Sequence, residues 1–173
     1  MNLGGEIKAG RDWAILRYGI NIKRYPVCYA VHRAIDALLD ILQWRPLAPG
    51  EIAAVDVSMG RVQAGMLRQH SPQTALDAKF SVEFALASAI LEKRVGLAEL
   101  NNAFVSSAAV QSLMLKVRVE AVDAVDPEDP LFSPFDQVRV RLKGGATLES
   151  EPVRRARGHA HNPIALEELH AKF

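Results

Sequence analysis

The sequence predicts an α+β fold in two layers, with a mainly antiparallel sheet and helices packed on one face of it. Short segments alternate apolar and polar residues, as in strands with one wet face; "VRVRL" at 138–142 is the clearest of them. Longer segments repeat apolar residues every three or four positions, as helices do, most clearly over residues 27–44. The "KGG" at 143–145 is typical of a tight hairpin between two strands.

The first part of the chain predicts a strand, a helix and a second strand. Residues 13–25, "WAILRYGINIKRY", are rich in β-branched and aromatic residues, which favours a strand ending at Pro26. The apolar stripe over 27–44 predicts the helix. Two prolines and a glycine then break the chain before a short strand over 52–60.

The second part predicts further helices and the remaining strands. Residues 61–74 are ambiguous and are interpreted as a surface loop. A helix is expected over 75–93, with Ser71 or Thr74 as its cap and many small residues for close packing. A last helix is expected to begin with Asn162 as cap and Pro163 at its first position. Two short helices are expected over 96–104 and 107–117, and an acidic loop over 123–136. The remaining strands are expected over 116–123, 137–145 and 146–157.

Size and charge narrow the class of protein. A chain of 173 residues with 49% hydrophobic residues is long enough for one domain with a real core. With 21 basic and 20 acidic residues, no clustered basic surface for nucleic acid is expected. We expect no membrane span or secretory leader, and a single cysteine, which excludes an internal disulfide, favours a reducing, cytoplasmic compartment.

A polar corner stands out where residues 21–42 pass into the expected helix. Lys23 ends the strand, Cys28 lies in the first helical turn, and His32 follows four residues later on the same face. A helix entrance with free N–H groups and nearby cations predicts an anion pocket, with carboxylates as the obvious guests. The structural alternatives stay open, because a lone cysteine or histidine is more often part of a core than of a site.

Other chemistry is disfavoured at these residues. No metal is expected, because no second cysteine or suitably spaced histidine pair accompanies Cys28, and the loop residues His159 and His161 are interpreted as solvated. A hydrolase using Cys28 and His32 lacks an orienting third group. Spacing alone therefore predicts an anion-binding corner and no reaction.

Three stretches in series resemble the C-terminal part of the MmgE/PrpD family, which includes 2-methylcitrate dehydratase, cis-aconitate decarboxylase and iminodisuccinate epimerase. They are "IKRYPVCYAVHRAIDALLDI", "SPQTALDAKFSVEFALASAIL" and "RRARGHAHNPIALEELHAKF". The resemblance implies a small α+β domain beside a large helical domain that this chain lacks. On this basis residues 1–12 are a linker, 13–162 the small domain, and 163–173 the start of a helix returning to the helical domain. A homodimer is implied as well.

The chemistry implied by the resemblance is proton abstraction next to a carboxylate of a small di- or tricarboxylic acid, without cofactor or metal. Lys23 matches a carboxylate-clamping lysine and, with Cys28, is assigned a catalytic role; His32 and Phe84 join Lys23 in the substrate-binding set. Cys28 and Phe84 stand where the decarboxylase branch has His and Tyr, which argues against decarboxylation and leaves dehydratase, epimerase or isomerase activity.

Two functions follow from the resemblance. The first is the small domain of such a lyase or isomerase, inactive alone. The alternative is a stand-alone ligand-binding or dimerisation module that has lost catalysis, with residues 85–91 and 103–115 as candidate apolar patches.

Overall fold

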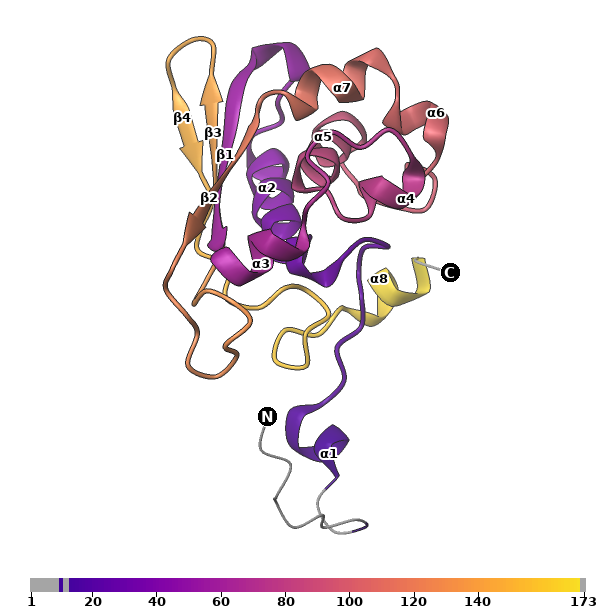
Figure 1. The fold of residues 1–173 in the computed structure, drawn as a ribbon, viewed down its shortest axis with the longest axis vertical. Helices are drawn as coiled ribbons and strands as arrows, with labels where there is room; N and C mark the ends of the chain where they lie inside the picture. The colour runs from indigo at the N-terminus through magenta and orange to yellow at the C-terminus, as the bar shows by residue number, and fades with distance from the viewer. Residues whose placement is uncertain (1–9, 11–12, 172–173) are drawn as a thin grey trace.

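The computed structural model describes Gly10 and residues 13–171, and these form a sheet layer and a helix layer (Figure 1). The four-stranded sheet has the order β2-β1-β3-β4. Its strands are β1 (Ile52–Gly60), β2 (Val117–Val122), β3 (Gln137–Leu142) and β4 (Thr147–Glu149). β1 pairs in parallel with β2, whereas the β1–β3 and β3–β4 pairs are antiparallel. The predicted α+β fold with a mainly antiparallel sheet is confirmed.

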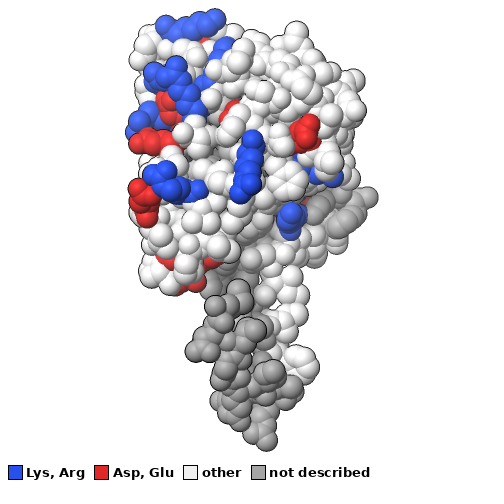
Figure 2. Space-filling view, in the orientation of Figure 1, with Lys and Arg blue, Asp and Glu red and all other residues white. Residues whose placement is uncertain are grey.

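The two faces of the sheet differ because alternate residues point to opposite sides. Val55 of β1 pairs with Val117 of β2 and Val140 of β3, and these valines face the helices. The next β1 residue, Asp56, pairs with Arg118 and Arg139 on the other face. Figure 2 shows Lys, Arg, Asp and Glu gathered over the side where the strands lie. The alternation seen in the sequence therefore separates core from surface.

Two central helices cover the apolar face of the sheet. α2 (His32–Trp44) lies against β3, and α5 (Val82–Glu92) lies against β2 and α2 (Figure 1). A 3-10 turn, η1 (Tyr29–Val31), leads into α2. α5 is buried on all sides over residues 82–90, as expected for a helix without a polar stripe. The remaining helical elements are η2 (Pro49–Glu51), α1 (Ala14–Tyr18), α3 (Arg61–Met66), α4 (Ala75–Ala78), α6 (Asn102–Val105), α7 (Ala108–Met114) and α8 (Leu166–Ala171).

Some predicted elements were wrong in type or extent. Residues 13–25 contain α1 and then irregular chain instead of a strand, because no neighbouring strand pairs with this segment. The expected surface loop over 61–74 begins with the short helix α3. The helix predicted over 75–93 is two helices, because the Ser81 hydroxyl accepts the Phe84 N–H and caps a new helix, α5.

The end of the chain also differs from its prediction. β4 occupies only Thr147–Glu149 of the strand expected over 146–157. The last helix, α8, starts at Leu166, because Asn162 is used in a turn: its carbonyl accepts the Gly158 N–H at 2.8 Å, and its side chain donates to the Arg155 carbonyl. The predicted linker over 1–12 lies outside the described residues apart from Gly10.

A buried polar network joins α2, α3 and the loop before β3. The Arg33 guanidinium, 3% exposed, donates to Asp136 Oδ1 at 2.6 Å and to Gln63 Oε1 at 2.7 Å. Ser133 contributes its carbonyl and hydroxyl as further acceptors for Arg33. Burial raises the pKa of the Asp136 carboxyl, and the charge of Arg33 opposes that rise. The network fixes these three segments relative to one another.

A second carboxylate of α2 holds both outer segments of the domain. Asp36, 2% exposed, accepts hydrogen bonds from the Tyr25 hydroxyl at 2.6 Å and the Arg157 backbone N–H at 2.7 Å. Nearby, the Ile22 N–H donates to the Gly158 carbonyl at 2.7 Å. Gly158 has φ +92°, and a side chain there would place its Cβ 2.0 Å from the Ile22 carbonyl oxygen, so only glycine fits. The segments before α2 and after β4 therefore lie side by side.

Replacing Arg33 with methionine should lower the free energy of unfolding by about 3–5 kcal/mol, because it leaves the Asp136 carboxylate buried without its partner. Urea unfolding followed by circular dichroism measures the change. The matched control is Arg139→Met, which removes an ion pair to Glu149 between half-exposed side chains and should change stability far less than Arg33→Met. Equal losses in the two variants would contradict the role assigned to the network.

Candidate carboxylate-binding hollow

Lys23 lines a hollow that is bordered by several cations. This hollow has a volume of ≈750 Å³ and is bordered by residues 23–26, the 93–99 segment after α5, Leu39 of α2, and Ile164 and Glu168. Lys23 is exposed, and its Nζ donates to the Val27 carbonyl at 3.2 Å. Because the segment from Tyr25 is fixed to Asp36, the position of Lys23 beside the hollow follows from the packing of α2.

Four cations and two carboxylates line this hollow. Arg24 bridges the buried Asp36 (3.3 Å) and Glu168 of α8 (3.0 Å). Arg94 is held by Glu99, whose buried carboxylate accepts from Arg94 Nε at 2.8 Å and from the Gly96 N–H at 2.8 Å. The guanidiniums are thus held in place by carboxylates. The lining as a whole carries more positive than negative groups. The charged residues in it are Lys23, Arg24, Lys93, Arg94, Glu99 and Glu168.

Cys28 lies away from the lining of this hollow. It is the residue before η1, and α2 begins only at His32, about one turn later than the sequence predicted. Its side chain is half-buried against the core, and its backbone N–H donates to the Lys79 carbonyl at 2.8 Å. The carbonyl of Lys79, between α4 and α5, therefore occupies one of the N–H groups at the helix entrance, where the sequence predicted free N–H groups for an anion.

His32 and Phe84 are fully buried. The His32 ring lies between Tyr25 and Tyr29, with ring centroids 5.1 and 5.0 Å away. Phe84 packs edge-to-face with Phe104 in the core, at 6.3 Å between centroids. Neither residue lines the hollow beside Lys23. Of the four predicted site residues, the structure brings only Lys23 to this hollow.

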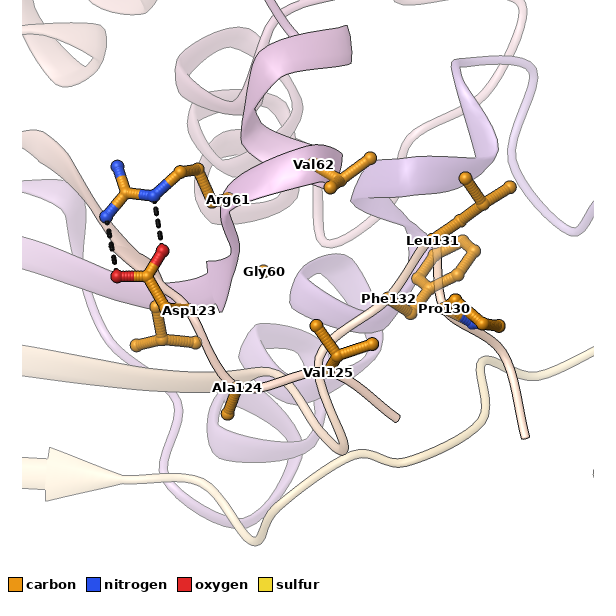
Figure 3. Close-up of a pocket in the computed structure, with 10 residues that line it drawn as sticks. Gly60, Arg61, Val62, Asp123, Ala124, Val125, Pro130, Leu131 and Phe132 are labelled. Atoms are coloured by element: carbon orange, nitrogen blue, oxygen red, sulfur yellow. Dashed lines mark hydrogen bonds and ion pairs between the residues drawn. The ribbon is translucent and has the colours of Figure 1, made fainter. Parts of the chain in front are cut away.

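A second hollow, at the end of β1, is less suited to an acid. Figure 3 shows Val62, Val125, Leu131 and Phe132 around it, and its volume is ≈180 Å³. Its charged residues, Arg61 and Asp123, point toward each other and form two hydrogen bonds of 2.5 and 3.1 Å (Figure 3). Because this cation is already neutralised at an apolar rim, the hollow offers little to a carboxylate.

Sequence reasoning missed the segment after α5 as part of the site. Lys93, Arg94 and Glu99 fall in "EKRVGLAEL", which the sequence analysis assigned to a helix end and a short helix. The run "KRVG", two cations and a glycine after an apolar helix, was the available signal. Its closeness to Lys23 depends on contacts between segments about 70 residues apart, which periodicity cannot reveal.

The described residues form neither a metal site nor a membrane-spanning helix. Within Gly10 and residues 13–171, no group of three or more His, Cys, Asp or Glu side chains could hold a metal ion. In the same part of the chain, every helix is too short or too polar to cross a membrane.

Comparison with known proteins gives one clear result. A family model described as the MmgE/PrpD C-terminal domain matches residues 25–173. Cys28, His32 and Phe84 fall within the match, whereas Lys23 lies two residues before it. No curated protein sequence matches the chain.

Changing Phe84 to tyrosine should lower the free energy of unfolding by about 1–3 kcal/mol, because the added hydroxyl would be buried in an apolar core. The thermal or urea midpoint measures this. Phe80→Tyr is the matched control, since Phe80 is 44% exposed and should change stability by less than about 0.5 kcal/mol. An unchanged midpoint for Phe84→Tyr would indicate that position 84 opens onto solvent or a polar pocket.

Proposed function

Because the chain belongs to the MmgE/PrpD family through that family's C-terminal domain, we propose that it is the small domain of a cofactor-independent lyase or isomerase. Its substrates are small di- or tricarboxylic acids, and its share of the work is to bind their carboxylates. A helical domain supplies the rest of the cleft, and the chain alone has no turnover, because one wall of a cleft cannot orient a substrate for reaction. The proposed compartment is the cytoplasm.

The hollow beside Lys23 is the observation that carries this proposal. Proton abstraction next to a carboxylate builds up negative charge, and fixed cations at that point lower the barrier. Lys23, Arg24, Lys93 and Arg94 border one hollow of ≈750 Å³, which leaves room for a small acid. Within it the half-exposed carboxylate of Glu168 bonds to Arg24 at 3.0 Å, so a substrate carboxylate would meet donors that already bind such a group.

The proposed roles of the other family positions rest on the resemblance. Cys28 as a proton carrier stays a prediction, and so do the substrate contacts of His32 and Phe84. Because His32 and Phe84 are buried, we propose that they position neighbouring residues and that Lys23 contacts the substrate directly. Dehydration, epimerisation or isomerisation is favoured over decarboxylation by Cys28 and Phe84, as argued from the sequence.

Replacing Lys23 with alanine should weaken binding of glutarate to the 173-residue chain about 10- to 100-fold, because a charge-assisted hydrogen bond to a carboxylate is lost. Isothermal titration calorimetry or an NMR titration measures the affinity. Lys143→Ala, in the exposed turn between β3 and β4, is the charge-matched control and should leave it unchanged. Wild-type affinity in Lys23→Ala would remove Lys23 from the site.

A second candidate function, a self-associating module, is favoured by a different surface from the one expected. The predicted patch 85–91 lies in the core, whereas 103–115 buries only Val105, Val110, Leu113 and Met114 and exposes Leu115. Large apolar side chains are exposed instead on the segment around α1, which extends away from the two layers (Figure 1). The most exposed of these side chains belong to Leu16, Tyr18 and Ile20.

If this segment mediates association, the chain should be a dimer by light scattering, and Leu16→Asp should shift it to a monomer. Leu76→Asp is the control, because Leu76 is also a largely exposed leucine but lies in α4, outside the segment around α1 and both predicted patches. A wild-type chain that stays monomeric at every concentration tested would leave the module function without support.

A further inference from the structure

Lys93 has an unusual backbone position at the end of α5. It is the C-cap of the helix with φ +56°, and it is the one residue other than glycine with a positive φ in the described part of the chain. Glycine is the usual residue at this left-handed position, because a Cβ there is sterically unfavourable. A lysine at this position is consistent with a structural or binding role for its side chain.

The ammonium of Lys93 is fixed but not neutralised. Its Nζ donates to the Ile90 carbonyl at 2.8 Å and to the Leu47 carbonyl at 3.2 Å. Among the described residues no Asp or Glu pairs with it, in contrast to Arg24 and Arg94 in the same hollow. Partial burial lowers the pKa of Lys93.

Lys93 also stands where two hollows adjoin. It lines the hollow beside Lys23 and a neighbouring one of ≈370 Å³, and the two share Arg24 and Leu39. Lys93 is therefore a lining residue of both hollows. The wall near Lys93 is partly apolar, through Leu39 and Val95.

We propose that Lys93 is a second carboxylate-binding cation of the hollow that Lys23 lines, so that the ligand is an acid with at least two carboxylates joined by a short carbon chain. One carboxylate binds at Lys23 and the other at Lys93, while the carbon chain lies along Leu39 and Val95. This inference rests on the proposed function and adds to it the residue that separates diacids from monoacids.

The alternative explanation is that Lys93 only caps the helix through its bond to the Ile90 carbonyl. Acid binding by the variant Lys93→Gly separates the capping role from the ligand-binding role. Lys93→Gly suits the left-handed backbone, so the variant should unfold at the same temperature as the parent or higher. If Lys93 only caps the helix, the same variant should bind the acid as the parent does.

The experiment compares glutarate with pentanoate, which has the same carbon number and one carboxylate fewer. With the 173-residue chain, Lys93→Gly should weaken glutarate binding about 10-fold or more and leave pentanoate binding within about 2-fold. Lys93→Arg should restore most of the preference for glutarate. Lys143→Gly is the control and should bind both acids like the parent. Lys93→Asn, which also tolerates the left-handed position, replaces Lys93→Gly if the latter does not fold.

The outcomes distinguish this inference from the proposed function. Parent-like glutarate binding in Lys93→Gly, with weakened binding in Lys23→Ala, would overturn the role of Lys93 and keep the proposed function. Equal losses for both acids in Lys93→Gly would also overturn it, since Lys93 would then bind the single carboxylate that they share. Failure of the parent chain to bind either acid would overturn both proposals.

Discussion

The buried pair between Arg33 and Asp136 constrains the rest of the domain. Removing two charges from water costs several kcal/mol per ion, so the pair needs further hydrogen bonds from its surroundings. Gln63 and Ser133 supply most of them, with contacts of 2.7 Å to 3.1 Å to the guanidinium and the carboxylate, and within this network only Nε of Arg33 is buried without a partner among the described residues. These residues come from α2, α3 and the loop before β3, so the three segments can be placed in one way only. The network thereby sets the position of α2 across the sheet.

The wall of the hollow that carries Lys23 and Arg24 is positioned by α2. Arg33 and Asp36, three residues apart in the helix, lie on neighbouring parts of its surface and face different segments. Arg33 faces the loop network, while Asp36 binds the segment that carries Lys23 and Arg24 and the segment that carries Arg157. Burial raises the pKa of Asp36, against the hydrogen bonds from Tyr25 and Arg157, so the carboxylate depends on both segments remaining in place. The wall beside Lys23 is thus held by a charge inside the domain.

Local sequence patterns predicted many of the helices and strands. Contacts between segments far apart in the chain decided which predicted strands pair and which residues meet at the hollow. β1 was predicted with its observed bounds, because alternation reports a buried and a wet face directly. The segment 13–25 has the composition of a strand, but strands need a partner, and no composition reveals that one is missing. Phe84 was assigned to the site by resemblance, yet its burial depends on Phe104 and the helices around it. Likewise Lys23 was identified from the sequence, whereas Lys93 and Arg94 meet it only through tertiary packing.

The cations that line the hollow differ in how firmly carboxylates of the chain already engage them. Arg24 is already engaged by Asp36 and Glu168, so a ligand carboxylate reaching it must displace Glu168 from a partly exposed ion pair worth at most about 1 kcal/mol. Arg94 is engaged more firmly, because Glu99 is buried and also bonds the Gly96 N–H. Lys93 has only carbonyl acceptors, which are neutral. Under the proposed function, a carboxylate at Lys93 adds a charge pair without breaking one, whereas at Arg24 or Arg94 it competes with Glu168 or Glu99.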